Sequence, residues 1–302
     1  MQVCANGIAI EVDDRGPPGG EPLLLIMGLG MQLVGWPDEL VADLVSRGFR
    51  VIRFDNRDAG LSQGFDHLGV PNIALAGLQH LVHWPVRAPY SLADMSRDAL
   101  GVLDALGISS AHVCGASLGG MVAQHLAAEY PQRVRSLCLL MTTSGSRRLP
   151  QATMAARSAM LYRPASGDPG ALADHLMKVF QVIGSPAYRP EPEAFRQRLL
   201  RSVQRAWRPS GTLRQLVAVA ADGDRTPLLA RIQAPTHVIH GMADPLVPLA
   251  NGQDLARRIP GATSDWVEGM GHDLPLALLP RIAEGITANA SRAVKQGVSQ
   301  PR

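Results

Sequence analysis

Three residues able to act together in nucleophilic catalysis stand at separate places in this chain. Ser117 lies in the run from Gly115 to Gly119, which fits the pattern G-x-S-x-G. Asp244 follows an apolar run, and His272 lies just after a glycine and before an expected helix. A serine hydroxyl is a weak nucleophile near neutral pH and needs a base, which an acid orients. The order serine, acid, histidine therefore predicts a Ser–His–Asp triad.

The sequence around the serine predicts a sharp turn between a strand and a helix. Ala111 to Cys114 reads as a buried strand, and Met121 to Tyr130 reads as a helix. Small residues beside Ser117 suit a turn in which the backbone passes close to itself. The helix would direct its unpaired N–H groups and positive end at the same spot, where an oxyanion could form.

Strand and helix patterns alternate along most of the chain, which predicts the α/β class with a doubly wound, mostly parallel sheet. Other expected strands cover 3–5, 8–12, 23–27, 49–54, 134–140, 236–240 and 263–267. Other expected helices cover 37–44, 75–84, 92–106, 249–258 and 274–288. Ligands bind at the carboxyl ends of strands in such sheets. Ser117, Asp244 and His272 each follow an expected strand, so we expect them to meet at this edge.

One stretch, residues 144–213, interrupts the alternation. It has no strand pattern, contains helical segments separated by prolines, and carries far more arginine than acid. We expect a helical cap over the carboxyl edge of the sheet, with a core formed by 1–143 and 214–290. The polar end, 291–302, is expected to be disordered. Met160 and Phe180 are candidates to line an apolar substrate pocket within the cap, or simply to pack the cap onto the sheet.

Composition restricts the class of protein. The chain has 302 residues, 46% of them hydrophobic, enough for one large domain with an insertion. The net charge is +3 without a long basic run, which argues against nucleic-acid binding. No apolar run reaches membrane-spanning length, and the N-terminus lacks a signal-peptide pattern. Cys4, Cys114 and Cys138 follow no ligand or disulfide spacing, which favours free thiols and a cytoplasmic location.

The elbow around Ser117 and the two partner residues together resemble the α/β-hydrolase superfamily, over roughly residues 1–290. Asp55 to Ser62 is similar to that family's D-x-R-G-x-G-x-S turn, with Asp58 replacing the usual glycine. Gly28-Leu29-Gly30 stands where the family carries its first oxyanion loop, although Met27 replaces the common histidine. Within the family, the cap and residues 221–225 look most like aclacinomycin methylesterase-type carboxylesterases.

The resemblance implies a serine esterase that needs no cofactor and acts on a small-molecule carboxylic ester. Ser117 would attack the carbonyl carbon, His272 would move the proton, and Asp244 would orient the imidazole. The backbone N–H groups of Leu118 and Leu29 would form the oxyanion hole, because these residues follow the nucleophile and Gly28 in the family pattern.

Two other readings of the same residues stay open. A perhydrolase or cofactor-free haloperoxidase would use the same triad, with peroxide entering the acyl-enzyme. A hydrolase-fold protein that binds without catalysis would keep the fold alone, and the complete set of three residues argues against it. Dehalogenase and epoxide hydrolase activities are disfavoured because both need an aspartate nucleophile at the elbow.

Several other residues could be mistaken for members of a site. Asp222, Asp224 and Asp273 are alternative acids, while the histidines at 112, 237 and 240 fall in strands and are expected to pack there. Cys114 is expected to be inaccessible within its strand. No metal site is expected at the histidines of 80 and 83, because no cysteine or acidic cluster accompanies them.

Overall fold

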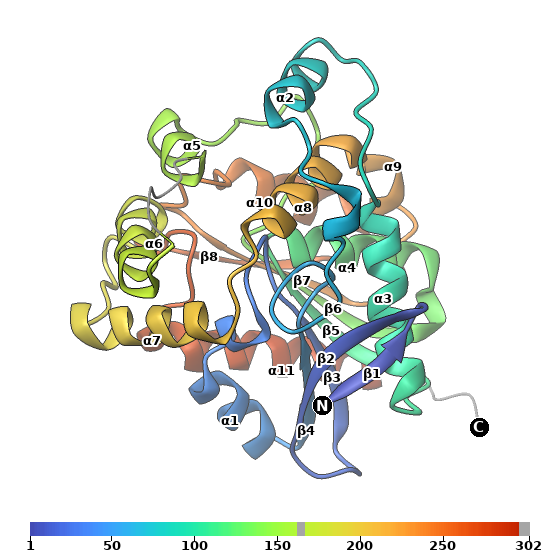
Figure 1. Ribbon diagram of the computed structural model, residues 1–302. Coiled ribbons are helices and arrows are strands. Elements are labelled where there is room, and N and C mark those ends of the chain that lie inside the picture. Colours follow the sequence, from blue (N-terminus) through green and yellow to red (C-terminus); the bar gives the residue numbers. More distant parts are fainter. Residues whose placement is uncertain (162–166, 296–302) are drawn as a thin grey trace.

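An eight-stranded sheet runs through the centre of the computed structural model, which describes residues 1–161 and 167–295 (Figure 1). The strands lie in the order β1-β2-β4-β3-β5-β6-β7-β8. Neighbours from β4 to β8 pair in parallel, and only the pairs β1–β2 and β2–β4 are antiparallel. The strands are β1 (Gln2–Ala5), β2 (Ile8–Arg15), β3 (Glu21–Ile26), β4 (Phe49–Phe54), β5 (Ala111–Ala116), β6 (Val134–Leu140), β7 (Thr236–Gly241) and β8 (Thr263–Val267). The predicted α/β class is confirmed.

Helices cover both faces of this sheet, as the doubly wound prediction requires. Helices α1 (Asp38–Ser46) and α11 (Leu279–Lys295) pack on one face, against the side chains of Leu23 and Leu25. Helices α3 (Leu92–Ala105), α4 (Leu118–Glu129) and α10 (Ala250–Arg258) pack on the other face, which carries Leu24 and Ile26. Because side chains alternate along a strand, four consecutive apolar residues of β3 serve both cores.

The C-terminal helix is longer than the sequence pattern suggested. Residues 291–295 were expected to be disordered, but α11 continues to Lys295. Ile282, Ile286, Ala290 and Ala293 are buried, so small alanines extend the helical stripe through an otherwise polar run. The rest of the expected disordered end, 296–302, lies outside the described residues.

The segment between β6 and β7 is helical, and it lies at the carboxyl end of the sheet (Figure 1). Its helices are α5 (Met154–Leu161), α6 (Pro169–Ile183), α7 (Pro192–Arg205), α8 (Pro209–Asp222) and α9 (Thr226–Leu229). Proline begins α6, α7 and α8, where the missing N–H has no intrahelical acceptor anyway. The cap boundary predicted at residue 213 falls inside α8, so the division into cap and core stays a prediction.

A second excursion lies between β4 and α3. It contains the helix α2 (Ile73–Leu81), which begins where the Asn72 side chain accepts a hydrogen bond from the Leu75 N–H. This helix projects from the body of the molecule at the top of Figure 1. Among the described helices, none has the length and apolar character needed to cross a membrane.

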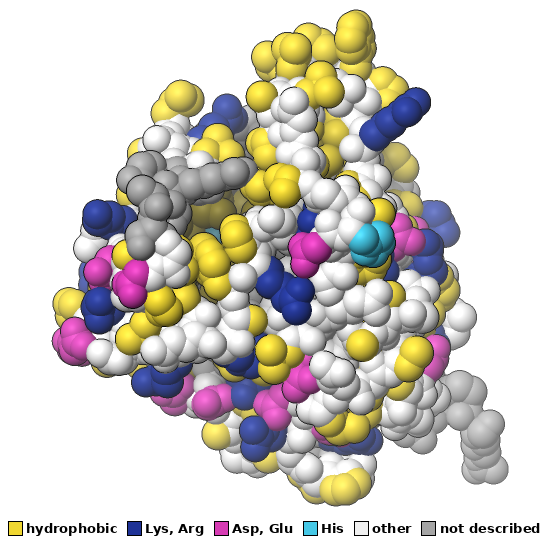
Figure 2. All heavy atoms as spheres, viewed as in Figure 1, with side chains coloured by type: hydrophobic (Ala, Val, Ile, Leu, Met, Phe, Trp, Pro, Cys, Tyr) yellow, Lys and Arg dark blue, Asp and Glu magenta, His cyan; other side chains and the backbone are white. Residues whose placement is uncertain are grey.

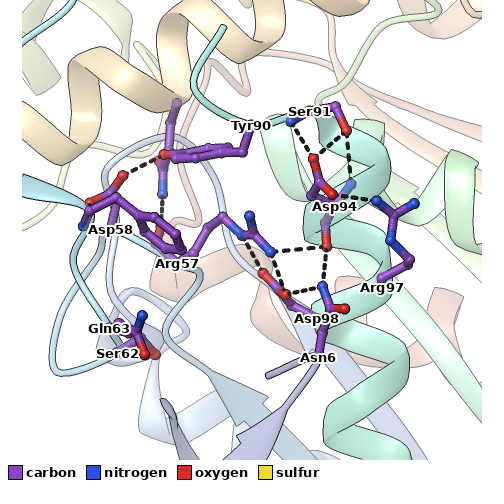
Figure 3. A network of polar contacts seen from close by, with 12 residues as sticks. Asn6, Arg57, Asp58, Ser62, Gln63, Tyr90, Ser91, Asp94, Arg97 and Asp98 are labelled. Atoms are coloured by element: carbon purple, nitrogen blue, oxygen red, sulfur yellow. Dashed lines mark hydrogen bonds and ion pairs between the residues drawn. The ribbon is translucent and has the colours of Figure 1, made fainter. Parts of the chain in front are cut away.

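Buried ion pairs hold the polar turn after β4 in place (Figure 3). Arg57 donates two hydrogen bonds of 2.6 Å to the carboxylate of Asp98 in α3, and Asn6 donates to the same carboxylate. The start of α3 is a capping box in which Ser91 and Asp94 bond each other's backbone N–H, as predicted with aspartate in place of glutamate. These contacts tie the turn to both the first hairpin and α3.

Asp58 links the same turn to the helical insertion. It has a φ of +65°, a region that suits glycine, yet its carboxylate accepts two hydrogen bonds of 2.8 Å from Arg214 in α8. The carboxylate also accepts from the Tyr90 hydroxyl and the Phe65 N–H. Burial works against the charge of Asp58, but the hydrogen bonds from Arg214 and the other donors outweigh it and lower the pKa of this carboxyl. The residue that departs from the family's glycine therefore joins turn and insertion.

Arg214→Met should destabilise the protein by about 3–5 kcal/mol, because it leaves the carboxylate of Asp58 buried without its charged partner. The measurement is the free energy of unfolding in urea. Arg281→Met is the matched control, because Arg281 makes a similar two-bonded pair with Asp265 at the surface and should cost under about 1 kcal/mol. Equal losses for the two variants would contradict the assignment. Adding Asp58→Gly to Arg214→Met should recover part of the loss.

Candidate active site

The serine lies on a strained turn between β5 and α4. Ser117 has φ +54° and ψ −120°, an unusual conformation for a residue with a side chain. A Cβ atom on Gly119 would lie 2.0 Å from the Ile26 carbonyl oxygen, and one on Gly115 would lie 2.3 Å from the Gly119 oxygen. Only glycine fits at either position, which is the physical reason for the pattern seen in the sequence.

The structure brings the three predicted residues together. His272 Nε2 lies 3.0 Å from the Ser117 hydroxyl oxygen, and His272 Nδ1 lies 2.7 Å from Oδ2 of Asp244. The second carboxylate oxygen of Asp244 accepts hydrogen bonds from the N–H groups of Leu246 and Val247, at 2.9 and 2.8 Å. The acid and the imidazole are both buried. This geometry can pass a proton from the serine to the imidazole while the carboxylate holds the ring.

The three alternative acids are engaged elsewhere. Asp222 pairs with His125 and Arg225, and Asp224 accepts a hydrogen bond from the Thr226 N–H. Asp273, the immediate neighbour of His272, instead accepts from the Ser185 N–H at 3.0 Å. Among the four candidate acids, Asp244 alone is hydrogen-bonded to the imidazole of His272 in the part of the chain that the structure describes.

The histidines and the cysteine that lie in strands are packed within the fold. His112 is buried, with Nδ1 2.8 Å from the Ser136 hydroxyl, and burial lowers the pKa of His112 to about 4. His240 Nε2 donates to the Val247 carbonyl at 2.7 Å, and His237 Nδ1 contacts the Thr263 hydroxyl at 2.8 Å. Burial raises the pKa of the Cys114 thiol, so the reactive thiolate is disfavoured.

The histidines of the projecting excursion contact backbone oxygens. His80 Nδ1 lies 3.2 Å from the Ala220 oxygen, and His83 Nδ1 lies 3.0 Å from the Leu81 oxygen. Within residues 1–161 and 167–295, no group of three or more His, Cys, Asp or Glu side chains is placed to hold a metal ion. Neither histidine therefore gains a set of co-ligands there.

The loop after β3 lies directly against the serine. A Cβ atom on Gly28 would be 3.2 Å from the Ser117 Cβ and 3.7 Å from its hydroxyl oxygen. The next N–H, that of Leu29, finds no acceptor among the described residues. Leu118 is the first residue of α4, where an N–H has no intrahelical acceptor. Both N–H groups thus remain available next to the serine.

Residues of the insertion that the sequence did not single out hold this loop. Gln215 in α8 accepts a hydrogen bond from the Gly30 N–H at 2.8 Å, and its amide donates to the Arg57 carbonyl at 2.7 Å. Gly30 has a φ of +65° and lies so close to Thr212 that a Cβ there would be 2.5 Å from its hydroxyl. The loop beside the serine is therefore positioned by α8.

A buried carboxylate makes a further tie between the same loop and α7. Asp55 is fully buried; it accepts hydrogen bonds from the N–H groups of Leu33 and Leu61 and from the Arg205 guanidinium. Arg205 also donates to the Gln32 side chain, whose amide in turn donates to backbone oxygens of α7 and its end. No local sequence pattern marks these partners, because they lie 150 or more residues apart.

The loop that carries His272 is held by the end of α6. The His272 N–H donates to the Ile183 carbonyl at 2.7 Å, and the Gly271 N–H donates to the Ser185 hydroxyl at 2.8 Å. Ser185 in turn bonds the carboxylate of Asp273. A Cβ on Gly271 would lie 2.5 Å from the backbone of Gly184, so the two segments touch. No pattern in the sequence indicated a role for Ser185.

The two predicted pocket residues lie in a small apolar cluster of the insertion. Met160 and Phe180 are half-buried against Ala156, Val179 and Ile183, and Leu246 of the acid loop packs on the same cluster. A separate surface cavity of about 520 Å³ lies at the junction of α7 and α8. Its lining includes Arg205, Trp207 and Arg208 but no member of the triad. A substrate-binding role for Met160 and Phe180 stays a prediction.

Comparison with known proteins agrees with the fold. The family model described as "alpha/beta hydrolase fold" matches residues 21–276. The chain belongs to the α/β-hydrolase family. This hydrolase is 30% identical to the rhodomycin D methylesterases of Streptomyces sp. (strain C5) and Streptomyces peucetius, over 96% of its length and 98% of theirs. It is an esterase-type hydrolase.

Among solved structures, one similar to this hydrolase is the meta-cleavage product hydrolase of Pseudomonas fluorescens IP01. The two superpose with a TM-score of 0.74 at 21% identity, over 97% of this chain and 98% of that one. At this identity the likeness shows the fold alone.

Proposed function

We propose that this hydrolase cleaves carboxylic esters through an acyl-enzyme, with Ser117 as nucleophile, His272 as base and acid, and Asp244 as the orienting group. The observation that carries the proposal is the continuous pair of contacts from Asp244 to His272 and from His272 to Ser117, at 2.7 and 3.0 Å. The full-length likeness to two methylesterases supports an ester substrate with a small alcohol group.

In the first half of the reaction, the Ser117 oxygen attacks the ester carbonyl carbon as its proton passes to His272 Nε2. The negative charge that develops on the carbonyl oxygen is stabilised by the N–H groups of Leu29 and Leu118. Asp244 stabilises the imidazolium through its bond to Nδ1. The imidazolium then gives its proton to the departing alcohol, and the acyl group stays on the serine.

In the second half, water replaces the alcohol. His272 takes a proton from water, the hydroxide attacks the acyl carbon, and the same N–H groups stabilise the second oxyanion. Collapse of this intermediate returns the proton to the Ser117 oxygen and releases the carboxylic acid. Every group needed belongs to the chain, and the proposal requires no cofactor.

We also propose a reducing cytoplasmic location, which the free thiols of all three cysteines fit.

Hydrolysis of p-nitrophenyl esters of increasing acyl length, together with methyl esters of aromatic acids, tests this function. We expect turnover and labelling of the protein by a fluorophosphonate probe. Absence of both would contradict an esterase and favour a binding protein. Peracid formation in the presence of acetate and hydrogen peroxide, faster than ester hydrolysis, would instead favour the perhydrolase reading.

Substitutions at Met160 and Phe180 should change which esters are preferred. We propose that their cluster, which shares Leu246 with the acid loop, borders the acyl group of the substrate. Met160→Ala and Phe180→Ala should lower kcat/KM several-fold for medium-sized apolar or aromatic esters. The kcat/KM for p-nitrophenyl acetate should stay nearly unchanged. Leu276→Ala, at an exposed residue outside the cluster, is the control. A ranking of esters indifferent to both cluster variants would assign these side chains to cap packing alone.

A further inference from the structure

Helix α2 directs its large apolar side chains toward solvent, unlike a helix whose apolar face packs on a core. It buries Ala76 and exposes Leu75, Leu78 and Leu81, which follow helical spacing on one face. Leu81 is 74% exposed, and Trp84, just beyond the helix, is 67% exposed. Soluble proteins rarely expose so many large apolar side chains together unless the patch has a partner.

The insertion adds to this apolar end of the molecule. Met154, the first residue of α5, is 78% exposed, and in Figure 1 α5 lies at the upper left, in the same upper half of the view as α2. We call the exposed side chains of Leu75, Leu78, Leu81, Val82, Trp84 and Met154 the apolar rim. Figure 2 shows hydrophobic side chains gathered over α2, with basic side chains nearby and no acidic side chain visible among them.

The two chain segments that carry the rim contain very few acidic residues. From His67 to Ala93 the only charged residue is Arg87, and from Tyr130 to Gly167 the sequence contains no acidic residue. Arg87, Arg147, Arg148 and Arg157 are all exposed. Apolar side chains with tryptophan among them and arginines alongside are the combination that anionic lipid surfaces attract.

The rim belongs to the catalytic end of the enzyme. Helix α5 begins where the Thr153 N–H bonds the Pro245 carbonyl, one residue after the triad acid. Helix α2 contacts α8 through His80 and the Ala220 carbonyl, and α8 holds the loop beside Ser117 through Gln215. A surface that engages the rim would therefore lie over the side of the molecule where the serine is reached.

We infer that the apolar rim docks the enzyme onto an anionic phospholipid surface, with its catalytic end toward the lipid. A projecting helix with leucines on its outer face can enter the boundary between headgroups and acyl chains, whereas a second protein copy would need a matching hollow. In this arrangement the rim rests at the surface of the membrane and does not cross the bilayer. The docking inference depends only on the rim and not on the proposed function. The consequence that esters dissolved in lipid are the substrates rests on the proposed function.

Sedimentation with vesicles tests the docking step without turnover, if the protein carries Ser117→Ala. We expect it to bind phosphatidylcholine vesicles that contain phosphatidylglycerol, and to bind pure phosphatidylcholine vesicles less. Leu81→Glu with Trp84→Glu should lower the partition coefficient about tenfold or more. Leu276→Glu, at an apolar residue that is 49% exposed outside the rim, should leave it unchanged. Replacing Arg147 and Arg148 by glutamine should weaken binding, as should added salt.

Tryptophan fluorescence gives a second readout of the same contact. The emission should shift to shorter wavelength on binding, and Trp84→Phe should remove the shift whereas Trp207→Phe, at the other exposed tryptophan, should not. Binding that is absent, or unaffected by the Leu81 and Trp84 changes, would overturn the inference. So would a dimer in solution that Leu81→Glu dissociates, because a second copy would then cover the rim. If the wild-type protein binds the vesicles but hydrolyses no ester, only the proposed function is contradicted.

Discussion

Replacing Ser117 by alanine should lower kcat by at least about 10³-fold while the fold is kept. The hydroxyl oxygen is the atom that the His272 imidazole contacts at 3.0 Å, so its removal leaves the base with nothing to activate except water. The loss of one oxygen disturbs packing little, because the turn is held by the glycines beside it. Steady-state kinetics on the preferred p-nitrophenyl ester measure the loss, and circular dichroism checks the fold.

Two controls make this result specific. Ser96→Ala removes another buried serine hydroxyl, one that has no hydrogen-bond partner, and should leave kcat unchanged. Cys114→Ala tests the nearby thiol and should also keep activity, because the thiol is buried within β5. Retention of more than about a tenth of the wild-type kcat in Ser117→Ala would remove the serine from the mechanism.

Replacing Asp244 by asparagine should lower kcat about 10⁴-fold with little change in structure. The asparagine oxygen can keep the hydrogen bonds from the N–H groups of Leu246 and Val247. Its amide nitrogen would then face His272 Nδ1 and donate to it. The imidazole would carry its proton on Nε2, the nitrogen that must accept the proton of Ser117, so the base would be held in the wrong tautomer.

The neighbouring carboxylates provide the matched comparison. Asp224→Asn should be nearly silent, because this carboxylate accepts a hydrogen bond from the start of α9 and makes no contact with His272 among the described residues. Asp222→Asn should lower stability through the His125 and Arg225 contacts, and leave kcat nearly unchanged. A larger loss of kcat in either variant than in Asp244→Asn would mean that the acid has been assigned wrongly.

Local pattern was sufficient to locate all eight strands, three of them to the residue, and it led to the triad that we propose. Mostly apolar runs mark strands buried on both faces, and residues 49–54 and 134–140 were located to the residue in this way. Residues 263–267 were also located to the residue, although this edge strand begins with exposed polar residues. The elbow glycines are fixed by contacts with Ile26 and with one another, which leaves a recognisable pattern. Because successive parallel strands end at one edge, the meeting of Asp244 and His272 followed from topology.

Contacts between distant segments could not be read in the same way. Gln215 and Gly30 are 185 residues apart, and any polar side chain on that face of α8 looks alike in the sequence. Ser185 belongs to a loop between two helices, and its role is visible only in the structure, where its hydroxyl accepts a hydrogen bond from the Gly271 N–H next to His272. The limit of α11 was misjudged because two alanines, a weak signal in a polar run, are what keep its last turns buried.

The bond between the His272 N–H and the Ile183 carbonyl also bears on attempts to graft specificity from one relative to another. An exchange of residues 144–213 as a cassette would cut α8 after its fifth residue and present a foreign α6 end to the histidine loop. A chimera should carry residues 183–185 together with 271–273, and the whole of α8 together with residues 28–33. In this enzyme, recombination has to follow contacts, since the segment proposed to select the ester also holds His272, the proposed base.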